Sequence, residues 1–165
     1  MDIEEILKYL SPITVGLLAA FLASKFALVK FKQEKTWGER RESYKEVIEA
    51  FEELAHWAEQ VRASHCCEPT IGGEAYFDES LRKISKFSAT GALFFSKSFH
   101  KIVEESNTKL SKTLFQVNEE SAPDSYTEQG VAEWHFILAK DVRDIIDENL
   151  PKLVSIAMDE SHKNT

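Results

Sequence analysis

The feature that most constrains this chain is an apolar run near its amino end, from Tyr9 to Val29, in which Lys25 carries the only charge. About 20 apolar residues in an α-helix span the roughly 30 Å hydrocarbon layer of a bilayer. Lys25 lies near one end of the run, where its long side chain can reach the headgroups. We therefore predict a transmembrane helix over residues 9–31, preceded by a short extracytoplasmic tail of residues 1–8.

Two other interpretations fit this run less well. A cleaved signal peptide has a basic start and small residues at its cleavage site, whereas this chain begins with Asp2, Glu4 and Glu5 and lacks a good small-x-small site. A buried helix in a soluble core rarely runs this long with so few polar residues. A retained membrane helix is the better match.

The charges on either side of the run predict its orientation. Basic residues outnumber acidic ones just after it, whereas acidic residues dominate the tail before it. Because basic flanks stay preferentially in the cytoplasm and are attracted to anionic lipid, we expect an outside N-terminus and a cytoplasmic body. In a bacterium, the membrane would be the inner membrane. The residues assigned to anchoring and topology are Lys25, Lys30, Lys32, Lys35, Trp37, Arg40 and Arg41, of which Trp37 fits the membrane interface and a plain core position equally.

Residues 32–158 are predicted to form a helical bundle. The first helix continues from the membrane segment to just before Glu68, because Trp37, Tyr44, Phe51 and Ala58 recur every seven residues with further apolar residues beside them.

Further amphipathic patterns cover about residues 78–88, 94–117 and 131–150. A break between the first two is expected at Thr90-Gly91. Asp78 is expected to cap the helix that it begins, and Pro151 to end or kink the last long helix. No stretch alternates with period two between hairpin turns. The predicted fold is therefore all-α, a single transmembrane helix continuing into a cytoplasmic antiparallel bundle, with a flexible tail at residues 159–165.

Composition limits the function classes. Lys and Arg number 20 against 28 acidic residues, so the net charge is −8, which disfavours nucleic-acid binding. The chain has no glycine-rich phosphate loop, no G-x-G-x-x-G fingerprint and no G-x-S-x-G elbow. We therefore expect neither an enzyme nor a cofactor.

The segment His65-Cys66-Cys67 holds the chain's two cysteines. Imidazole and thiolate are metal ligands and thiols are redox-active, but a structural zinc site needs four compatible ligands. A disulfide between adjacent cysteines is also strained. Two free thiols at a helix end are the plainer interpretation, and redox sensing or metal binding stays open.

Glu53-x-x-His56 has the spacing found in di-iron helical bundles, which need two such pairs and two further carboxylates. His100 and His135 have no glutamate three places before them. A surface glutamate beside a helix-edge histidine is the simpler interpretation, and core or half-exposed positions are expected for His100 and His135.

A membrane span followed by Lys32-Gln33-Glu34-Lys35-x-Trp37-x-Glu39-Arg40-Arg41-x-x-Tyr44, then Ile48 and Leu54, resembles a diffuse group of uncharacterised small bacterial membrane-anchored helical proteins. The resemblance covers roughly the first 60 residues. It implies an inner-membrane location and no particular activity or site residue.

The leading hypothesis is a membrane-anchored helical interaction or scaffold module, whose partners are membrane lipid and either another protein or a second copy. A second hypothesis is a ligand or redox sensor that uses the bundle interior or Cys66 and Cys67. The third is a metalloenzyme of the bundle type, for which metal analysis of purified protein is the discriminating measurement.

Overall fold

A computed structural model describes residues 3–70, 76–120 and 127–163 of the 165-residue chain; within these ranges it leaves undescribed the side chains of residues 3–15, 17, 33, 34, 36, 120, 162 and 163. The described residues are helical apart from short connections, and no strand occurs among them. This confirms the all-α prediction. The chain divides into two compact units, Met1–Arg40 and Arg41–Thr165.

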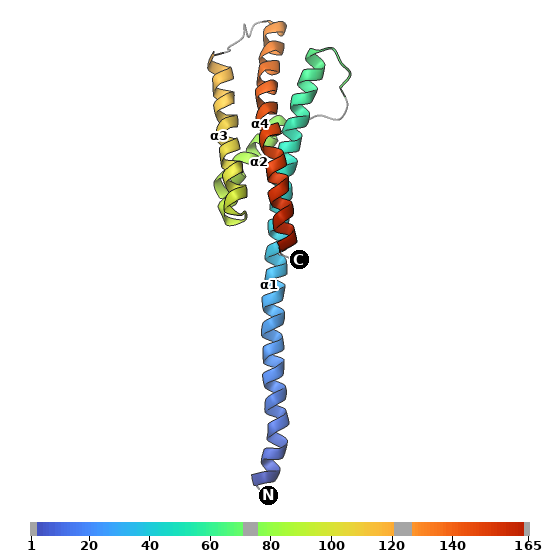
Figure 1. Cartoon of the computed structure of the whole chain (residues 1–165), viewed down its shortest axis with the longest axis vertical. Coiled ribbons are helices and arrows are strands. Elements are labelled where there is room, and N and C mark those ends of the chain that lie inside the picture. The colour runs from blue at the N-terminus through green and yellow to red at the C-terminus, as the bar shows by residue number, and fades with distance from the viewer. Residues whose placement is uncertain (1–2, 71–75, 121–126, 164–165) are drawn as a thin grey trace. The chain divides into compact units, whose positions relative to one another are not determined.

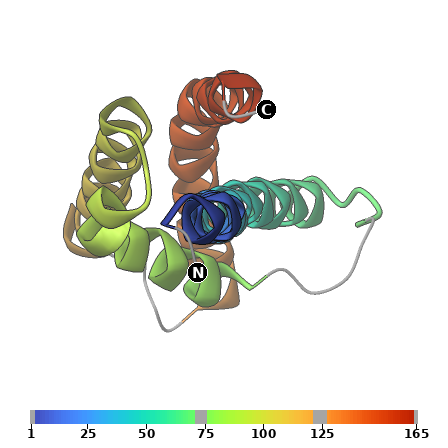
Figure 2. The same cartoon turned by 90° about the horizontal axis from the view of Figure 1, so that it is seen from below.

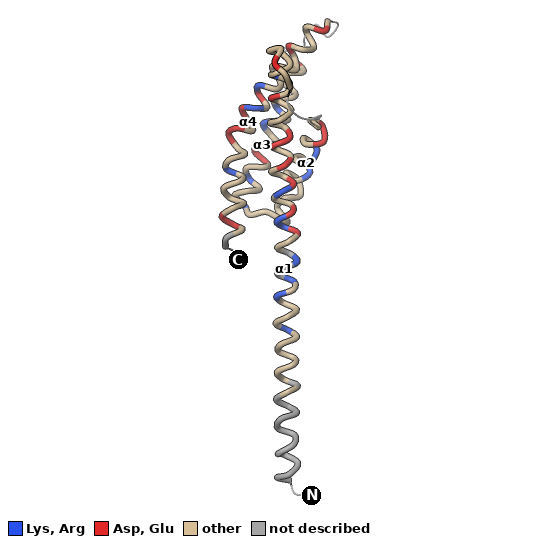
Figure 3. The backbone as a smooth tube through the Cα atoms, turned by 90° about the vertical axis from the view of Figure 1, so that its right-hand side faces the viewer, with Lys and Arg blue, Asp and Glu red and all other residues tan. Residues whose placement is uncertain are grey.

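The first unit consists of the amino-terminal part of α1, which extends from Ile3 to His65 (Figure 1). Its described side chains at 16 and 18–32 are all exposed. The large apolar ones are Leu18, Phe21, Leu22, Phe26, Leu28, Val29 and Phe31, between 50% and 72% exposed. In Figure 3 the described backbone of this unit is mainly uncharged, with scattered basic positions.

Among the residues that the structure describes, no helix is both long and apolar enough to cross a membrane. The transmembrane helix predicted over 9–31 includes residues 9–15 and 17, whose side chains lie outside the described part.

The second unit packs the carboxyl-terminal part of α1 against α2 (Phe77–Thr90), α3 (Lys97–Glu120) and α4 (Glu128–Lys163). Within this unit α3 runs in the same direction as α1, and α4 runs opposite to both (Figure 1). Seen from below, α2 (green), α3 (yellow) and α4 (red) lie on different sides of the second unit (Figure 2), and buried apolar side chains of its helices form one interior. The predicted helical bundle is therefore present.

Apolar side chains from all four helices fill this interior. The stripe predicted on α1 is buried, and it meets equivalent stripes on the other helices. The largest fully buried side chains are Val47, Phe51, Leu54, Ile84, Phe99, Val103, Leu110, Leu138, Val142, Ile146 and Leu153. Removing this apolar surface from water is the main source of stability in such a bundle, because non-polar burial contributes about 25 cal/mol per Å².

The break expected at Gly91 is present, as a single 3₁₀ turn, Gly91–Leu93. A Cβ atom on Gly91 would lie 2.6 Å from Cδ2 of Phe95 and 2.8 Å from Cδ2 of His100. A side chain at this position would therefore require the Phe95 and His100 rings to shift at the turn from α2 into α3. Phe95 is buried and Phe94 is half-buried, so neither ring is fully exposed.

The expected cap of α2 is wrong by two residues. The N-cap residue is Tyr76, without a side-chain capping bond, and Asp78 lies within the first turn. The helix begins early because the Phe77 ring packs on Trp57, with ring centroids 4.1 Å apart. In the first turn the Asp78 carboxylate still interacts favourably with the helix dipole.

Pro151 neither ends α4 nor divides it into two helices, because α4 continues to Lys163. A proline inside a helix costs about 3 kcal/mol or more through its missing N–H and its ring. Here Pro151 is exposed, and fully buried Ile146 and Leu153 hold the helix on both sides of it. The helix therefore includes residues 159–163, for which we expect a flexible tail.

Candidate functional site

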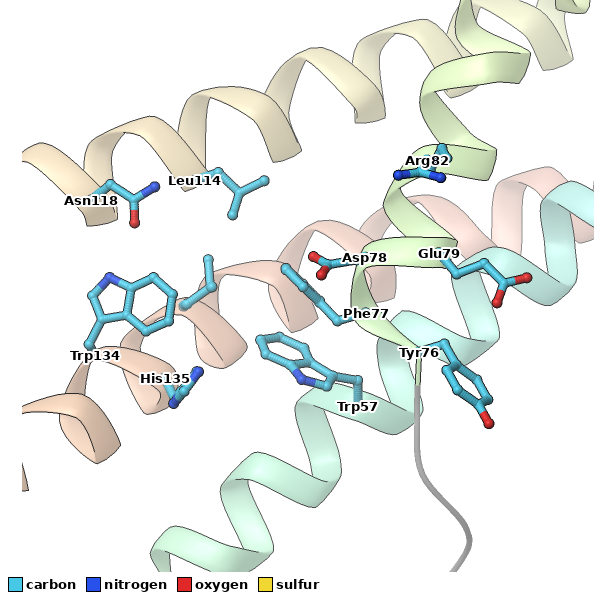
Figure 4. A pocket seen from close by; sticks show the side chains of 11 residues that line it. Trp57, Tyr76, Phe77, Asp78, Glu79, Arg82, Leu114, Asn118, Trp134 and His135 are labelled. Carbon is cyan, nitrogen blue, oxygen red and sulfur yellow. The ribbon is translucent and has the colours of Figure 1, made fainter. Parts of the chain in front are cut away.

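A groove of about 990 Å³ opens in the second unit, and all four helices contribute residues to it (Figure 4). It lies where α2 begins, beside the last third of α3 and the first third of α4. Its lining consists of Trp57, Tyr76, Phe77, Asp78, Glu79, Arg82, Leu114, Asn118, Trp134, His135 and Leu138. We call this opening the aromatic groove.

Aromatic rings from three helices form the apolar part of the aromatic groove. Trp57 of α1 lies against Phe77 of α2 at 4.1 Å between centroids and an interplanar angle of 33°. Trp134 of α4 meets His135 edge-on at 4.7 Å. Trp57, Phe77 and Trp134 are half-buried, so each ring is held by packing on one side and is accessible on the other.

Charged and polar groups border these rings. Asp78, Arg82, Asn118 and His135 are exposed, and the structure gives none of them a hydrogen bond or an ion pair with any described residue. Glu79 differs, because its carboxylate pairs with the ammonium of Lys83 at 2.9 Å. The hydrogen bond from Lys83 lowers the pKa of Glu79. The aromatic groove thus keeps one carboxylate, one guanidinium, one amide and one imidazole available to a guest.

This arrangement suits binding. Half-buried aromatic rings remove a guest's apolar surface from water, and polar groups without partners orient that guest. Among the described residues, no group of three or more His, Cys, Asp or Glu side chains is placed to hold a metal ion.

The residues assigned to anchoring and topology all lie on α1. Lys25, Lys30, Lys32, Lys35, Arg40 and Arg41 are exposed, and Trp37 is half-buried. The Lys25 ammonium lies 5.6 Å from the centroid of the Phe21 ring, in cation–π geometry.

Cys66 and Cys67 are free and exposed at the carboxyl end of α1. Cys67 has a positive φ of 56°. The N–H of Glu68 donates a hydrogen bond to the carbonyl oxygen of Ala63 at 2.8 Å, and the N–H of Cys67 donates one to the carbonyl oxygen of Ser64 at 3.2 Å. This pair of bonds is the Schellman helix end, whose left-handed position is usually glycine.

His65 does not join the two thiols in a described metal site. Its ring stacks on Phe136 of α4, with centroids 4.2 Å apart and an angle of 17°. This contact holds the end of α1 against α4.

The remaining histidine candidates have structural partners. Nε2 of His56 lies 3.0 Å from Nε2 of Gln60, and Nε2 of His100 lies 2.9 Å from the carbonyl oxygen of Ser88. The spacing Glu53-x-x-His56 is therefore not accompanied by a described metal site.

The sequence does not single out the aromatic groove, because Trp57, Phe77, Leu114 and Trp134 are far apart along the chain. One signal was available. Trp57 immediately precedes Ala58 of the buried stripe, so its large ring sits at the edge of the core face, where rings are half-covered.

Comparison with known proteins finds no matching family model, no similar curated protein and no similar solved structure. The resemblance to small membrane-anchored helical proteins therefore stays a prediction.

Proposed function

We propose that this protein is a membrane-anchored interaction module, in which residues 9–31 of α1 cross a bilayer and the helical second unit binds a protein partner. The observation that carries the proposal is the exposure of large apolar side chains along residues 18–31. Fully burying one such side chain contributes about 1.5–3 kcal/mol. A run of them in water is correspondingly unfavourable, and a covering environment would stabilise the chain.

The distribution of these side chains favours lipid over a second helix. Successive residues on a helix are about 100° apart, so Leu18, Phe21, Phe26 and Phe31 point to different sides. The positions between them hold alanine, leucine or valine, with Ser24 and Lys25 as the polar exceptions before Lys30. One partner helix covers a stripe, whereas a bilayer surrounds the helix on every side.

The exposed basic residues that follow support an orientation. Lys30, Lys32, Lys35, Arg40 and Arg41 would lie at the cytoplasmic face, where anionic headgroups attract them. The second unit would then face the cytoplasm, with residues 1–8 outside and the bacterial inner membrane as the location.

Fractionation tests the anchor. The full-length chain should sediment with membranes, resist alkaline extraction and require detergent for release. Leu22→Glu combined with Phe26→Glu should move it to the soluble fraction, because buried carboxylates are costly in lipid.

A matched control carries the same two substitutions at Leu93 and Phe115, which are also more than half exposed but belong to the second unit. This control should stay with the membrane. Recovery of the unaltered chain in the soluble fraction after detergent-free lysis would overturn the anchor.

The chain's own thiols test the orientation. Cys66 and Cys67 are its two cysteines and both are exposed. A membrane-impermeant maleimide should label them only after the inner membrane is opened. In a Cys66→Ser, Cys67→Ser background, Asp2→Cys should instead be labelled in intact spheroplasts. The opposite labelling pattern would reverse the topology.

A second candidate function, a thiol-based redox sensor, is favoured by the exposure of both thiols. A peroxide would take two electrons and two protons from the thiols of two copies, which form an intermolecular disulfide, and would itself be reduced to water. Peroxide-treated protein should then run as a dimer on a non-reducing gel. An unchanged oxidant response in cells that carry Cys66→Ser and Cys67→Ser would exclude this function.

A further inference from the structure

We infer that the aromatic groove receives an amphipathic helix of a partner protein, which inserts an apolar side chain against Trp57 and Trp134 and offers a basic and an acidic residue to Asp78 and Arg82. This inference rests on the proposed interaction function and names the kind of partner.

The first argument is the accessible aromatic surface. Trp57, Phe77 and Trp134 are half-buried, and fully buried Leu138 also lines the groove. Figure 4 shows the two indole rings on the same side of the opening, with Leu114 and Asn118 across from them. Tryptophan-lined hollows of this kind are typical positions for the central anchor of an interface.

The second argument is an unused pair of charges. Asp78 and Arg82 are four residues apart on α2, yet the structure gives no ion pair between them. Elsewhere on this unit, charges at the same spacing do pair, for example Glu79 with Lys83 at 2.9 Å and Arg143 with Asp147 at 2.8 Å. A partner helix with Lys and Glu one turn apart would complement both groups.

The third argument is the shape of the opening. Small-molecule sites enclose most of a ligand's surface, whereas six residues that line the aromatic groove are exposed to solvent: Tyr76, Asp78, Glu79, Arg82, Asn118 and His135. Exposed apolar groups also extend beyond it, because Tyr76 lies at its edge and Val131 lies one helical turn before Trp134 and His135. An open groove with an apolar border fits one face of a helix.

Tryptophan fluorescence provides a direct test. The full chain is studied in detergent micelles with Trp37→Phe, so that the two remaining tryptophans are both in the groove. The probe is a synthetic helix with Leu and Phe at i, i+3, i+4 and i+7, and with Lys and Glu four residues apart on its flank. A scrambled peptide of the same composition is the control. The probe should cause a saturable emission shift, and the scrambled peptide should not.

A charge exchange tests the assigned pairing. Asp78→Arg combined with Arg82→Asp should weaken binding of the probe by about tenfold, because like charges then face each other. A second probe, in which Lys and Glu are exchanged, should bind this variant more tightly than it binds the unaltered chain. The charge-exchanged variant must keep the helical circular dichroism of the unaltered chain. Trp134→Leu, with Trp57 retained, must keep it too, and this variant should independently lose binding of the probe.

The remaining outcomes overturn the inference. Equal binding of probe and scrambled peptide, or no saturable shift with either, would exclude a helix-specific groove. A shift with an amphiphilic dye alone would indicate a small-molecule site, and a shift that depends only on protein concentration would indicate a second copy. Because binding is measured in micelles, a failed fractionation test would remove the membrane anchor without altering this result.

Discussion

The hydroxyl of Tyr44 donates a hydrogen bond to the carboxylate of Glu160, although the two residues are 116 positions apart. The same hydroxyl oxygen accepts a hydrogen bond from the backbone N–H of Ser96 at 3.0 Å. The Tyr44 ring is buried between Phe95 and Phe99, with centroids 5.0 and 4.5 Å away. One side chain of α1 therefore connects the start of α3 and the last turns of α4.

Replacing this hydroxyl should weaken the second unit. We expect Tyr44→Phe to lower the free energy of unfolding by about 1–3 kcal/mol, because it leaves the Ser96 N–H and the Glu160 carboxylate without this partner. Urea denaturation measures the change. Tyr76→Phe is the matched control: Tyr76 is exposed, so the same substitution should change stability by less than about 0.5 kcal/mol. Equal effects of the two substitutions would contradict the role of the Tyr44 hydroxyl.

The same contact predicts a pH dependence. Burial, and then the hydrogen bond to Glu160, raise the pKa of Tyr44 above its ordinary value of 10.0. The folded state therefore holds the phenolic proton more tightly than the unfolded state. This stabilisation is complete below about pH 10 and is lost as the pH rises through the folded-state pKa. The difference in unfolding free energy between the unaltered chain and Tyr44→Phe should shrink as the pH rises from about 8 to about 11. A difference that grows over this range would contradict a raised pKa of Tyr44.

The turn at Gly91 should not tolerate a side chain. Gly91→Ala would place a methyl group 2.6 Å from Phe95 and 2.8 Å from His100. We expect a loss of about 1–3 kcal/mol in unfolding free energy, as in other overpacked cores. Gly38→Ala is the matched control, since a Cβ there meets nothing within 4 Å. Thermal unfolding should separate the two variants, and a neutral Gly91→Ala would show that Phe95 moves aside without cost.

Two buried polar residues should respond in opposite directions to truncation. The Ser106 hydroxyl is buried without a hydrogen-bond partner in the described part of the structure, so Ser106→Ala should raise stability by about 1 kcal/mol. The Asn149 amide instead donates to the carbonyl oxygen of Ile145 at 2.8 Å, so Asn149→Ala should lower stability by about 1–3 kcal/mol. We expect the denaturation midpoint of Ser106→Ala to lie above that of the unaltered chain and the midpoint of Asn149→Ala to lie below it.

The end of α1 offers a stabilising substitution. Cys67 has a φ of 56°, a backbone conformation that glycine adopts without steric cost. Cys67→Gly should therefore raise stability by about 1 kcal/mol. Cys66→Gly should bring no such gain, because the positive φ belongs to Cys67. A gain from both substitutions would point to removal of the thiols as the cause.

Local patterns in the sequence predicted much of the second unit. The seven-residue recurrence of Tyr44, Phe51 and Ala58 identified the buried face of α1, and the break at Gly91 was expected. Both follow from neighbours within one helix or one turn, which the sequence displays directly. The start of α2 and the continuation of α4 through Pro151 were not predicted, because contacts with other helices outweigh the local preference at those positions.

By itself, the sequence determined that the described chain is helical and which side chains of α1 form a buried stripe, because periodicity is a property of each helix alone. Only the tertiary structure decided that Trp57, Phe77, Leu114 and Trp134 border one groove and that Tyr44 meets Glu160. An apolar stripe specifies that a helix must be covered, but not by which neighbour. That choice depends on how side chains from all four helices fill the shared interior together.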